Sequence, residues 1–231
     1  MRNAGMFDSF EKDGSTPRVS LFPDLRITTI GIEFEEQARS EGFRSVAGVD
    51  EVGRGCLAGP VVAAACILDL TKELPKGLDD SKKLTAKRRD EIAEQLKIEC
   101  VAFAVGQIEA PEIDRINILE ATKMAMLAAI AKLDPAADFL LIDALHLKQS
   151  QLPQKAIIKG DSISASIAAA SILAKTYRDD LMKAYDVEFP QYGFAGHKGY
   201  GAAAHLAALR EHGHCSLHRR SFRGVLPTES S

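Results

Sequence analysis

Four acidic side chains stand at the ends of apolar stretches in this sequence. Asp50 and Glu51 follow Val46–Val49, Asp143 ends a second apolar run, and Asp161 closes a third. Asp and Glu are depleted in strands, so acids that repeatedly end apolar runs require an explanation. In an open α/β sheet, ligands gather outside the carboxyl ends of the strands. Parallel neighbouring strands would bring all four carboxylates into one cleft there.

Four carboxylates in one cleft would repel one another and raise each other's pKa. Divalent cations remove that repulsion, and an all-oxygen ligand set without nearby His or Cys suits Mg²⁺ or Mn²⁺ rather than Zn²⁺. Two such ions, about 3.5–4 Å apart, recur in phosphodiester cleavage, where one activates the attacking water and the other stabilises the leaving oxygen. We therefore predict a two-metal site formed by Asp50, Glu51, Asp143 and Asp161.

Each acid also has a simpler interpretation. Asp50 and Glu51 could form a solvated strand end or a loop that only binds phosphate, Asp143 could merely end its strand, and Asp161 could cap a helix. Adjacent strand residues point to opposite faces, so Asp50 and Glu51 can serve one site only where the pleat breaks. The glycines of the following Gly53-Arg54-Gly55 turn permit that break. The coincidence of all four acids favours metal binding.

The elements that position these acids follow from the apolar pattern. Runs that are apolar on both faces are typical of strands covered by helices on each side, so we predict an α/β sheet with a parallel part. Strands are predicted at Val46–Asp50, Pro60–Leu68, Glu99–Ile108, Phe139–Asp143 and Ala156–Asp161, the first two as an antiparallel hairpin. Helices are predicted at 30–41, after an N-cap at Thr85 and after an N-cap at Asp114. A longer helix is predicted from Ser162 to Ala184, with Asp161 or Ser162 as its N-cap. The last predicted helix runs from Gly201 to His212 and is ended by Gly213.

The 231-residue chain fits one domain with an appendage. We predict a loosely ordered extension at 1–29, a catalytic domain with a helical C-terminal part at 30–225, and a tail at 226–231. The longest apolar run, Pro60–Leu68, is far shorter than the roughly 20 residues of a membrane-spanning helix. No secretory signal is expected. The four cysteines form no Cys-x-x-Cys pair, so we expect a reduced, cytoplasmic protein, and we assume a monomer.

The charge of the chain is unevenly distributed. The net charge is −3, but residues 1–41 contain eight acidic and five basic residues, so the remainder is neutral overall. Residues 191–225 contain one acidic residue against five basic ones, which predicts a basic C-terminal surface. The overall charge therefore does not exclude a phosphate-bearing substrate.

Six motifs occur in a fixed order over roughly residues 30–225. They are Gly48-Val49-Asp50-Glu51-Val52-Gly53-Arg54-Gly55, Asp80-Ser81-Lys82-Lys83-Leu84, Ile142-Asp143, Lys159-Gly160-Asp161-Ser162, His197-Lys198-Gly199-Tyr200-Gly201 and His218-Arg219-Arg220-Ser221-Phe222. This series resembles bacterial ribonuclease HII, and several long motifs in order are more specific than one short pattern. The resemblance implies a ribonuclease H-like fold, with a mixed five-stranded sheet flanked by helices and a helical C-terminal region. It also implies hydrolysis of RNA within RNA–DNA hybrids and incision on the 5′ side of ribonucleotides embedded in duplex DNA.

The resemblance further implies roles for individual residues. The four acids would be catalytic, metal-binding carboxylates for Mn²⁺ or Mg²⁺, and the products would carry 3′-hydroxyl and 5′-phosphate ends. The substrate would be bound by three groups: the turn residues Gly53, Arg54 and Gly55 at the 2′-hydroxyls of the RNA–DNA junction, Tyr200 stacked on the deoxyribose beyond it, and Lys82, Lys83, Lys198, Arg219 and Arg220 at backbone phosphates.

Two further features leave alternatives open. His212, His214, Cys215 and His218 are all zinc-ligand types, but seven consecutive residues can scarcely surround one tetrahedral ion, so we interpret them as surface histidines beside a phosphate-binding stretch. Val19–Phe22 resembles the Leu-Phe-ended peptides that dock on the bacterial sliding clamp; a plain tail is the first interpretation and clamp contact the alternative.

Two other functions remain as alternatives to a ribonuclease. One is a related two-metal DNA nuclease of the resolvase or transposase type, which has no use for the Gly-Arg-Gly turn or for Tyr200. The other is an inactive module that only binds hybrids, although intact acids at every matched position argue against it. Duplex DNA with a single ribonucleotide, incubated with Mg²⁺ or Mn²⁺, separates these functions.

Overall fold

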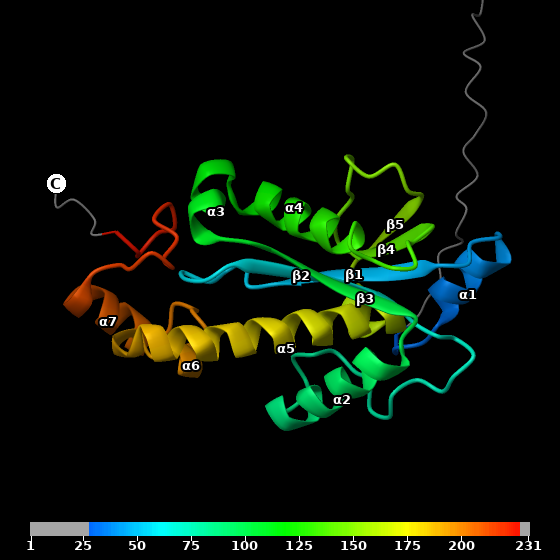
Figure 1. Ribbon diagram of the computed structural model, residues 1–231, viewed down its shortest axis with the longest axis horizontal. Coiled ribbons are helices and arrows are strands. Elements are labelled where there is room, and N and C mark those ends of the chain that lie inside the picture. Colours follow the sequence, from blue (N-terminus) through cyan, green and yellow to red (C-terminus); the bar gives the residue numbers. More distant parts are fainter. Residues whose placement is uncertain (1–27, 227–231) are drawn as a thin grey trace, which may run out of the picture.

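A mixed five-stranded sheet, ordered β3-β2-β1-β4-β5, forms the centre of the computed structural model (Figure 1). The structure describes residues 28–226, so the Val19–Phe22 motif and nearly all of the predicted extension lie outside it. β1 pairs antiparallel with β2, and β2 with β3, whereas β1–β4 and β4–β5 are parallel. The strands are β1 Val46–Val52, β2 Val61–Ile67, β3 Ala102–Ile108, β4 Phe139–Asp143 and β5 Gln154–Ile157. The predicted fold class and the β1–β2 hairpin are confirmed.

Helices cover both faces of the sheet (Figure 1). On one face lie α3 (Ala110–Ile116) and α4 (Ile118–Ile130), and on the other lie α2 (Ala86–Glu99) and the long α5 (Ala165–Glu188). The remaining helices are α1 Glu33–Ser40 before the sheet, and α6 Phe194–His197 and α7 Ala203–His212 beside the far end of α5. Within the described residues, no helix is long and apolar enough to cross a membrane.

The sheet separates two main hydrophobic cores. Every residue of β2 is buried, because its alternate side chains enter opposite cores. Met126 and its neighbours on α4 fill one core together with Ile142, and Ile92 of α2 and Leu173 of α5 fill the other. The two-faced burial that the apolar runs predict is therefore confirmed.

The close approach of α5 to β1 depends on small side chains. A Cβ atom at Gly48 of β1 would lie only 2.0 Å from the backbone carbon of Ser166 in α5. Ala165, Ala168 and Ala169 of the same helix are fully buried. Glycine on the strand and alanine on the helix thus bring the two backbones together, and with them the segment that precedes α5.

Two predicted helix starts are wrong. Asp114 lies inside α3 rather than at an N-cap, and Asn117 caps α4 by accepting from Leu119 N and Glu120 N. Asp114 instead accepts from Arg220 N and Ser221 N, at 2.8 and 2.9 Å, and so anchors the C-terminal segment.

The start of α5 is also later than predicted. Its N-cap is Ser164, whose hydroxyl accepts from Ile167 N, so neither Asp161 nor Ser162 caps it. By contrast, Thr85 caps α2 as predicted, and Gly213 ends α7. A capping role for Asp161 is therefore excluded, which removes its simplest structural explanation.

Candidate active site

Asp50 and Glu51 lie where the sheet loses one of its ladders. The parallel ladder between β1 and β4 ends at Val49 and Ile142, while the ladder between β1 and β2 continues through Val52. The expected break in the pleat between the two acids is therefore wrong, since both remain in a strand. β1 extends beyond the residues that pair with β4, so Asp50 and Glu51 have no β4 residue beside them. This brings both acids next to Asp143, the last residue of β4.

Asp143 and Asp161 come from the neighbouring segments. Asp143 is the last residue of β4, and its Oδ1 accepts from Gly160 N at 2.7 Å. Asp161 does not end a strand as predicted, because β5 stops at Ile157 and a short 3₁₀ helix, Gly160–Ser162, follows. The Asp143–Gly160 hydrogen bond thus holds the segment that carries Asp161 beside the end of β4.

The four acids influence one another electrostatically. Burial raises the pKa of Asp50 well above its ordinary value, and the nearby charges of Glu51 and Asp143 raise it further. Burial likewise raises the pKa of Glu51 and of Asp143, with Asp143 adding to the first and Asp161 to the second. Each acid is therefore linked to the next, and the group of four requires positive charge nearby.

Two basic side chains partly supply that charge. Lys82 Nζ lies 2.7 Å from Asp161 Oδ2, and Arg54 Nη1 lies 3.2 Å from Glu51 Oε1. The hydrogen bond from Lys82 to Asp161 raises the pKa of Lys82. Both cations extend from exposed positions but pair with buried carboxylates, so each could leave only if another cation took its place.

The donor set fits divalent cations. Glu51 Oε2 is buried and has no hydrogen-bond partner. As the side chains stand, no three Asp, Glu, His or Cys residues within 28–226 are arranged to hold a metal ion. Lys82 and Arg54 occupy oxygens that a cation would use. The described residues therefore contain no preformed metal site. The excess negative charge of the four acids and the unpartnered Glu51 Oε2 are nevertheless compatible with binding cations.

The predicted substrate-binding turn follows these acids directly. Gly53 has φ of +88°, and a Cβ there would lie 2.3 Å from Arg178 Nε, so only glycine fits. Gly55 is exposed, and a Cβ there would meet nothing within 4 Å. Arg54 projects between them and reaches Glu51. The turn therefore lies against the carboxylates, as the motif order predicts.

Arg219 is not placed for the predicted phosphate contact. Its side chain is fully buried, donates through Nε and Nη2 to Gly59 O, and through Nη1 to Arg54 O at 2.9 Å. Burial lowers its pKa to about 10. A basic residue in a motif can contact a ligand at the surface or hydrogen-bond to buried backbone. Here the Arg219 guanidinium hydrogen-bonds to the backbone of the turn.

The other basic candidates remain at the surface. Lys83 is exposed and pairs with Asp79 at 3.1 Å, and Arg220 is exposed beside Asp114. Lys198 is half-buried, with Nζ bonded to the Ala195 carbonyl, and burial lowers its pKa. Side chains at these positions can approach a phosphate backbone.

Tyr200 is 42% exposed, which is large for an aromatic ring in a short loop. The preceding Gly199 has φ of +82°, and its carbonyl accepts from Leu57 N at 2.8 Å. The His197–Gly201 motif is thereby held against the segment that follows the Gly-Arg-Gly turn. An available ring beside this turn supports a stacking role.

His212 and His214 are at the surface as expected, whereas His218 belongs to a buried histidine network. His218 is 2% exposed, and its Nε2 lies 3.0 Å from His205 Nε2. Because Cys215 N donates to His218 Nδ1, the neutral ring donates from Nε2 to His205, which in turn donates from Nδ1 to Tyr200 O. Only His212 and His214 of the predicted group are exposed. The network supports the backbone of Tyr200, and none of it forms a zinc site within the described residues.

Acid is expected to destabilise the protein through His218. Burial, followed by the neighbouring charges of His205, His214 and His197, lowers the pKa of His218 to about 4. The unfolded state takes up a proton below its ordinary pKa of about 6.5, whereas the folded state resists it until about pH 4. The stabilising contribution of neutral His218 is therefore complete above about pH 6.5 and disappears as the pH falls towards 4.

Urea unfolding of wild type and of His218→Asn measures this contribution. The free-energy difference between the two proteins should shrink by about 3 kcal/mol from pH 7 to pH 4, because other titrating groups cancel. A difference that stays constant with pH would contradict the assignment.

The structure also reveals residues that the motifs do not indicate. Arg178, in the middle of α5, is fully buried and donates to three backbone carbonyls around the turn. Ser171 of the same helix hydrogen-bonds to the Asp50 side chain and to Ser81 Oγ, the latter at 2.9 Å. The sequence gives no signal for Arg178, because its half of α5 also carries Lys175, Asp179, Asp180 and Lys183.

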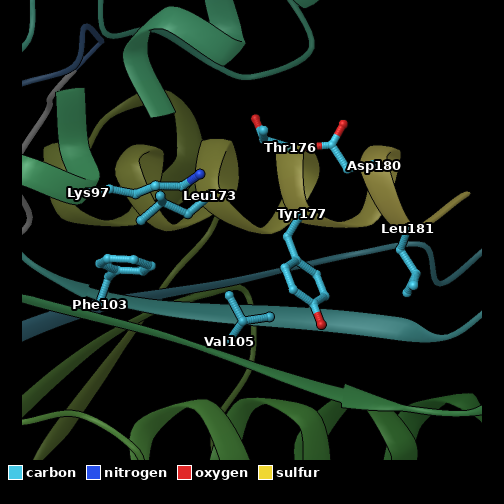
Figure 2. Close-up of a pocket in the computed structure, with 8 residues that line it drawn as sticks. All are labelled: Lys97, Phe103, Val105, Leu173, Thr176, Tyr177, Asp180 and Leu181. Carbon is cyan, nitrogen blue, oxygen red and sulfur yellow. The ribbon is translucent and has the colours of Figure 1, made fainter. Parts of the chain in front are cut away.

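A separate groove of about 240 Å³ lies over α5, between α2 and β3 (Figure 2). Figure 2 shows rings of Phe103 and Tyr177 on its sheet side and Lys97 at one end. None of the four acids lines this groove. It is therefore distinct from the candidate active site.

Known proteins resemble this chain over most of its length. A family model described as Ribonuclease HII matches residues 47–225. The chain is 60% identical over 193 residues to a ribonuclease HII from Chlamydia caviae, covering 83% of this chain and 90% of the relative. It is 49% identical over 207 residues to one from Syntrophotalea carbinolica, covering 90% and 98%.

Solved structures share the fold. The ribonuclease H2 from Pyrococcus horikoshii OT3 superposes with a TM-score of 0.69 at 25% identity, covering 79% of this chain and 95% of that one. A ribonuclease HII from Archaeoglobus fulgidus, solved in a complex with PCNA, has a TM-score of 0.64 at 25% identity, covering 81% and 98%. Bst-RNase HIII, solved with Mn²⁺, has a TM-score of 0.62 at 23% identity, covering 81% and 70%. The chain therefore belongs to the ribonuclease HII family, the metal-dependent endoribonucleases that hydrolyse RNA in RNA–DNA hybrids.

Proposed function

We propose that this chain also incises duplex DNA on the 5′ side of an embedded ribonucleotide and leaves 3′-hydroxyl and 5′-phosphate ends. The observation that carries the proposal is the meeting of four carboxylates with the Gly53–Gly55 turn, where β1 runs past the end of β4. The carboxylates would hold the cations, and the turn would contact the ribose. Both would then act on the same nucleotide. The 2′-hydroxyl is the group by which a protein distinguishes ribose from deoxyribose.

Asp50, Glu51, Asp143 and Asp161 are the proposed ligands of two divalent cations. Two Mg²⁺ or Mn²⁺ ions would supply an activated water and neutralise charge at the leaving oxygen. The unpartnered Glu51 Oε2 and the raised pKa values of three of the acids support this ligand set. Bst-RNase HIII, which shares the fold, was solved with Mn²⁺. In this chain Lys82 and Arg54 would release their carboxylates as cations bind.

The proposed substrate surface joins the turn to the C-terminal helices. Tyr200 would stack on the deoxyribose next to the ribonucleotide, and the turn would contact the 2′-hydroxyl. Lys83, Lys198 and Arg220 would contact phosphates, which positions a duplex without reading its sequence. Lys82 would first release Asp161, which would then be free to bind a cation, and its ammonium group would contact a phosphate instead. The proposed helical substrate-binding part would comprise α6, α7 and the segment after them.

A 5′-labelled DNA duplex with one ribonucleotide tests the proposal. With Mg²⁺ or Mn²⁺ we expect a single cut on the 5′ side of the ribonucleotide. Chelation by EDTA should leave no product, because the carboxylates alone can neither activate the attacking water nor neutralise charge on the leaving oxygen. The matched all-DNA duplex should remain intact, since it lacks the 2′-hydroxyl. Product mobility and ligation by DNA ligase identify the end groups.

The same assay decides among the alternatives. No cleavage of the ribonucleotide-containing duplex, despite binding, would support an inactive hybrid-binding module. Equal cleavage of the all-DNA duplex would support a DNA nuclease of the resolvase or transposase type. Either result would reject the proposed specificity.

A sliding-clamp contact through Val19–Phe22 stays a prediction, because this motif lies outside the described residues. The complex of the Archaeoglobus fulgidus relative with PCNA supports the idea that such a contact can serve this family. The expectations of a monomer and of a cytoplasmic location likewise remain predictions.

A further inference from the structure

Arg178 joins the two segments that are proposed to contact the substrate. Its guanidinium donates from Nε to Pro60 O and from Nη2 to Ala58 O, both at 3.0 Å, and from Nη1 to Lys198 O at 2.8 Å. Ala58 and Pro60 follow the Gly-Arg-Gly turn, and Lys198 precedes Tyr200 by two residues. One rigid, planar group therefore bridges both segments.

The guanidinium also fills the space directly beneath the turn. A Cβ at Gly53 would lie 2.3 Å from its Nε, and a Cβ at Gly59 would lie 3.3 Å from its Nη2. A Cβ at Gly199 would lie 2.4 Å from Ala58 O, the carbonyl that Arg178 binds. Three glycines thus permit the two segments to close around one side chain.

Burial of the Arg178 guanidinium carries a desolvation cost that a purely structural role does not explain. Arg178 is fully buried, and none of the ion pairs within residues 28–226 involves it. Arg219, a second fully buried guanidinium, lies near enough for Arg178 to contribute to its lowered pKa. Apolar residues of similar volume often stabilise a core as well as buried charges do. What an apolar residue cannot provide is a fixed geometry among three carbonyls.

We propose that Arg178 is a positioning residue for ribonucleotide recognition, which sets the Gly53-Arg54-Gly55 turn and Tyr200 in register on one nucleotide step. The inference rests on the proposed function of these two segments. Arg178 touches neither substrate nor cation. It fixes the distance between the turn and Tyr200, which are the groups proposed to contact the substrate. Loosening it misaligns the scissile phosphate relative to the carboxylates, while Lys83 and Arg220, which are exposed and form no hydrogen bond with Arg178, remain in place to contact phosphates.

Arg178→Met and Arg178→Lys test the proposal, with Arg89→Met as the matched control. Arg89 is also a buried arginine; it lies in α2 and donates to Asp179 at 3.2 Å and to Leu84 O, so within residues 28–226 its hydrogen bonds do not reach the turn. Methionine fills the space without donors, and lysine keeps the charge without the three-way fork. The measurements are thermal unfolding, and kcat and KM on the single-ribonucleotide duplex, at a temperature where each protein is folded.

Both Arg178 variants are expected to lose about a hundredfold in kcat, with KM within about threefold of wild type, because misplacement by about 1 Å is enough for such a loss. Arg89→Met should lose stability but keep the wild-type kcat. If Arg178→Met does not fold, Arg178→Gln replaces it, because its amide can reach one segment but not both.

Three results would overturn the proposal: wild-type kcat in folded Arg178→Lys, an equal fall of kcat in Arg89→Met, or a change in KM alone. Failure of the proposed function is separately visible, because the wild-type protein would then cut all-DNA duplex as fast as the ribonucleotide-containing one.

Discussion

Replacement of Asp143 by asparagine is expected to abolish cleavage, with a fall in rate of about a thousandfold or more, because a lost ligand removes several kcal/mol of transition-state stabilisation. Asparagine keeps the shape and the Oδ1 acceptor for Gly160 N, so the Asp161 segment should stay in place. Only the negative charge is lost. Duplex affinity should change less than about threefold, since phosphate contacts lie elsewhere.

Initial rates at saturating Mn²⁺ or Mg²⁺, and fluorescence anisotropy of a labelled duplex without divalent metal, check this result. Asp138→Asn is the matched control, because Asp138 precedes β4 and, among the described residues, its carboxylate accepts hydrogen bonds from Arg44 N and Ser45 N. It should retain wild-type cleavage. An Asp143→Asn protein that keeps the wild-type rate would show that the ligand assignment is wrong.

Replacement of Gly48 by alanine should lower the free energy of unfolding by about 3 kcal/mol or more, at the upper end of the range for overpacked cores. The added Cβ would lie 2.0 Å from the carbon and 2.3 Å from the carbonyl oxygen of Ser166, so backbone rather than a flexible side chain must yield. α5 would move away from β1 and carry the Asp161 segment with it. The protein should therefore lose both stability and cleavage.

Urea unfolding and cleavage rates, measured below the unfolding transition, check the effect. Gly55→Ala is the control for stability, because it adds the same Cβ where nothing lies within 4 Å and φ is not positive. Its free energy of unfolding should stay within about 0.5 kcal/mol of wild type, as for most surface changes. Equal stability of the Gly48 and Gly55 variants would mean that α5 does not depend on this contact.

The pattern of apolar runs was sufficient to predict the sheet, its hairpin and the helices on both faces. These features are predictable because strand and helix periods are local properties of the chain. The same holds for Thr85 and Gly213 as helix boundaries, since capping depends on neighbouring residues. Where capping residues competed, as at Asp114 and Asn117, local preference did not decide which one was used.

The roles of the basic residues were less predictable. Arg219 and Arg220 are adjacent in one motif, yet the first is buried beneath the turn and the second is exposed. His218 and His214 differ in the same way. Charge and motif membership carry no information about burial, because a guanidinium or imidazole can be satisfied by distant backbone carbonyls or by another ring as well as by water.

The sequence alone indicated which acids to group and in what order they occur, because each follows an apolar run, although only Asp143 ends a strand. Only the tertiary structure decided how they meet. β1 extends past the last residue that β4 pairs with, Asp143 holds Gly160, and Asp161 enters from a 3₁₀ turn rather than from a strand. It also decided that Arg178 lies between the turn and Tyr200. These arrangements depend on contacts between residues 17 to 120 positions apart, which no local pattern specifies.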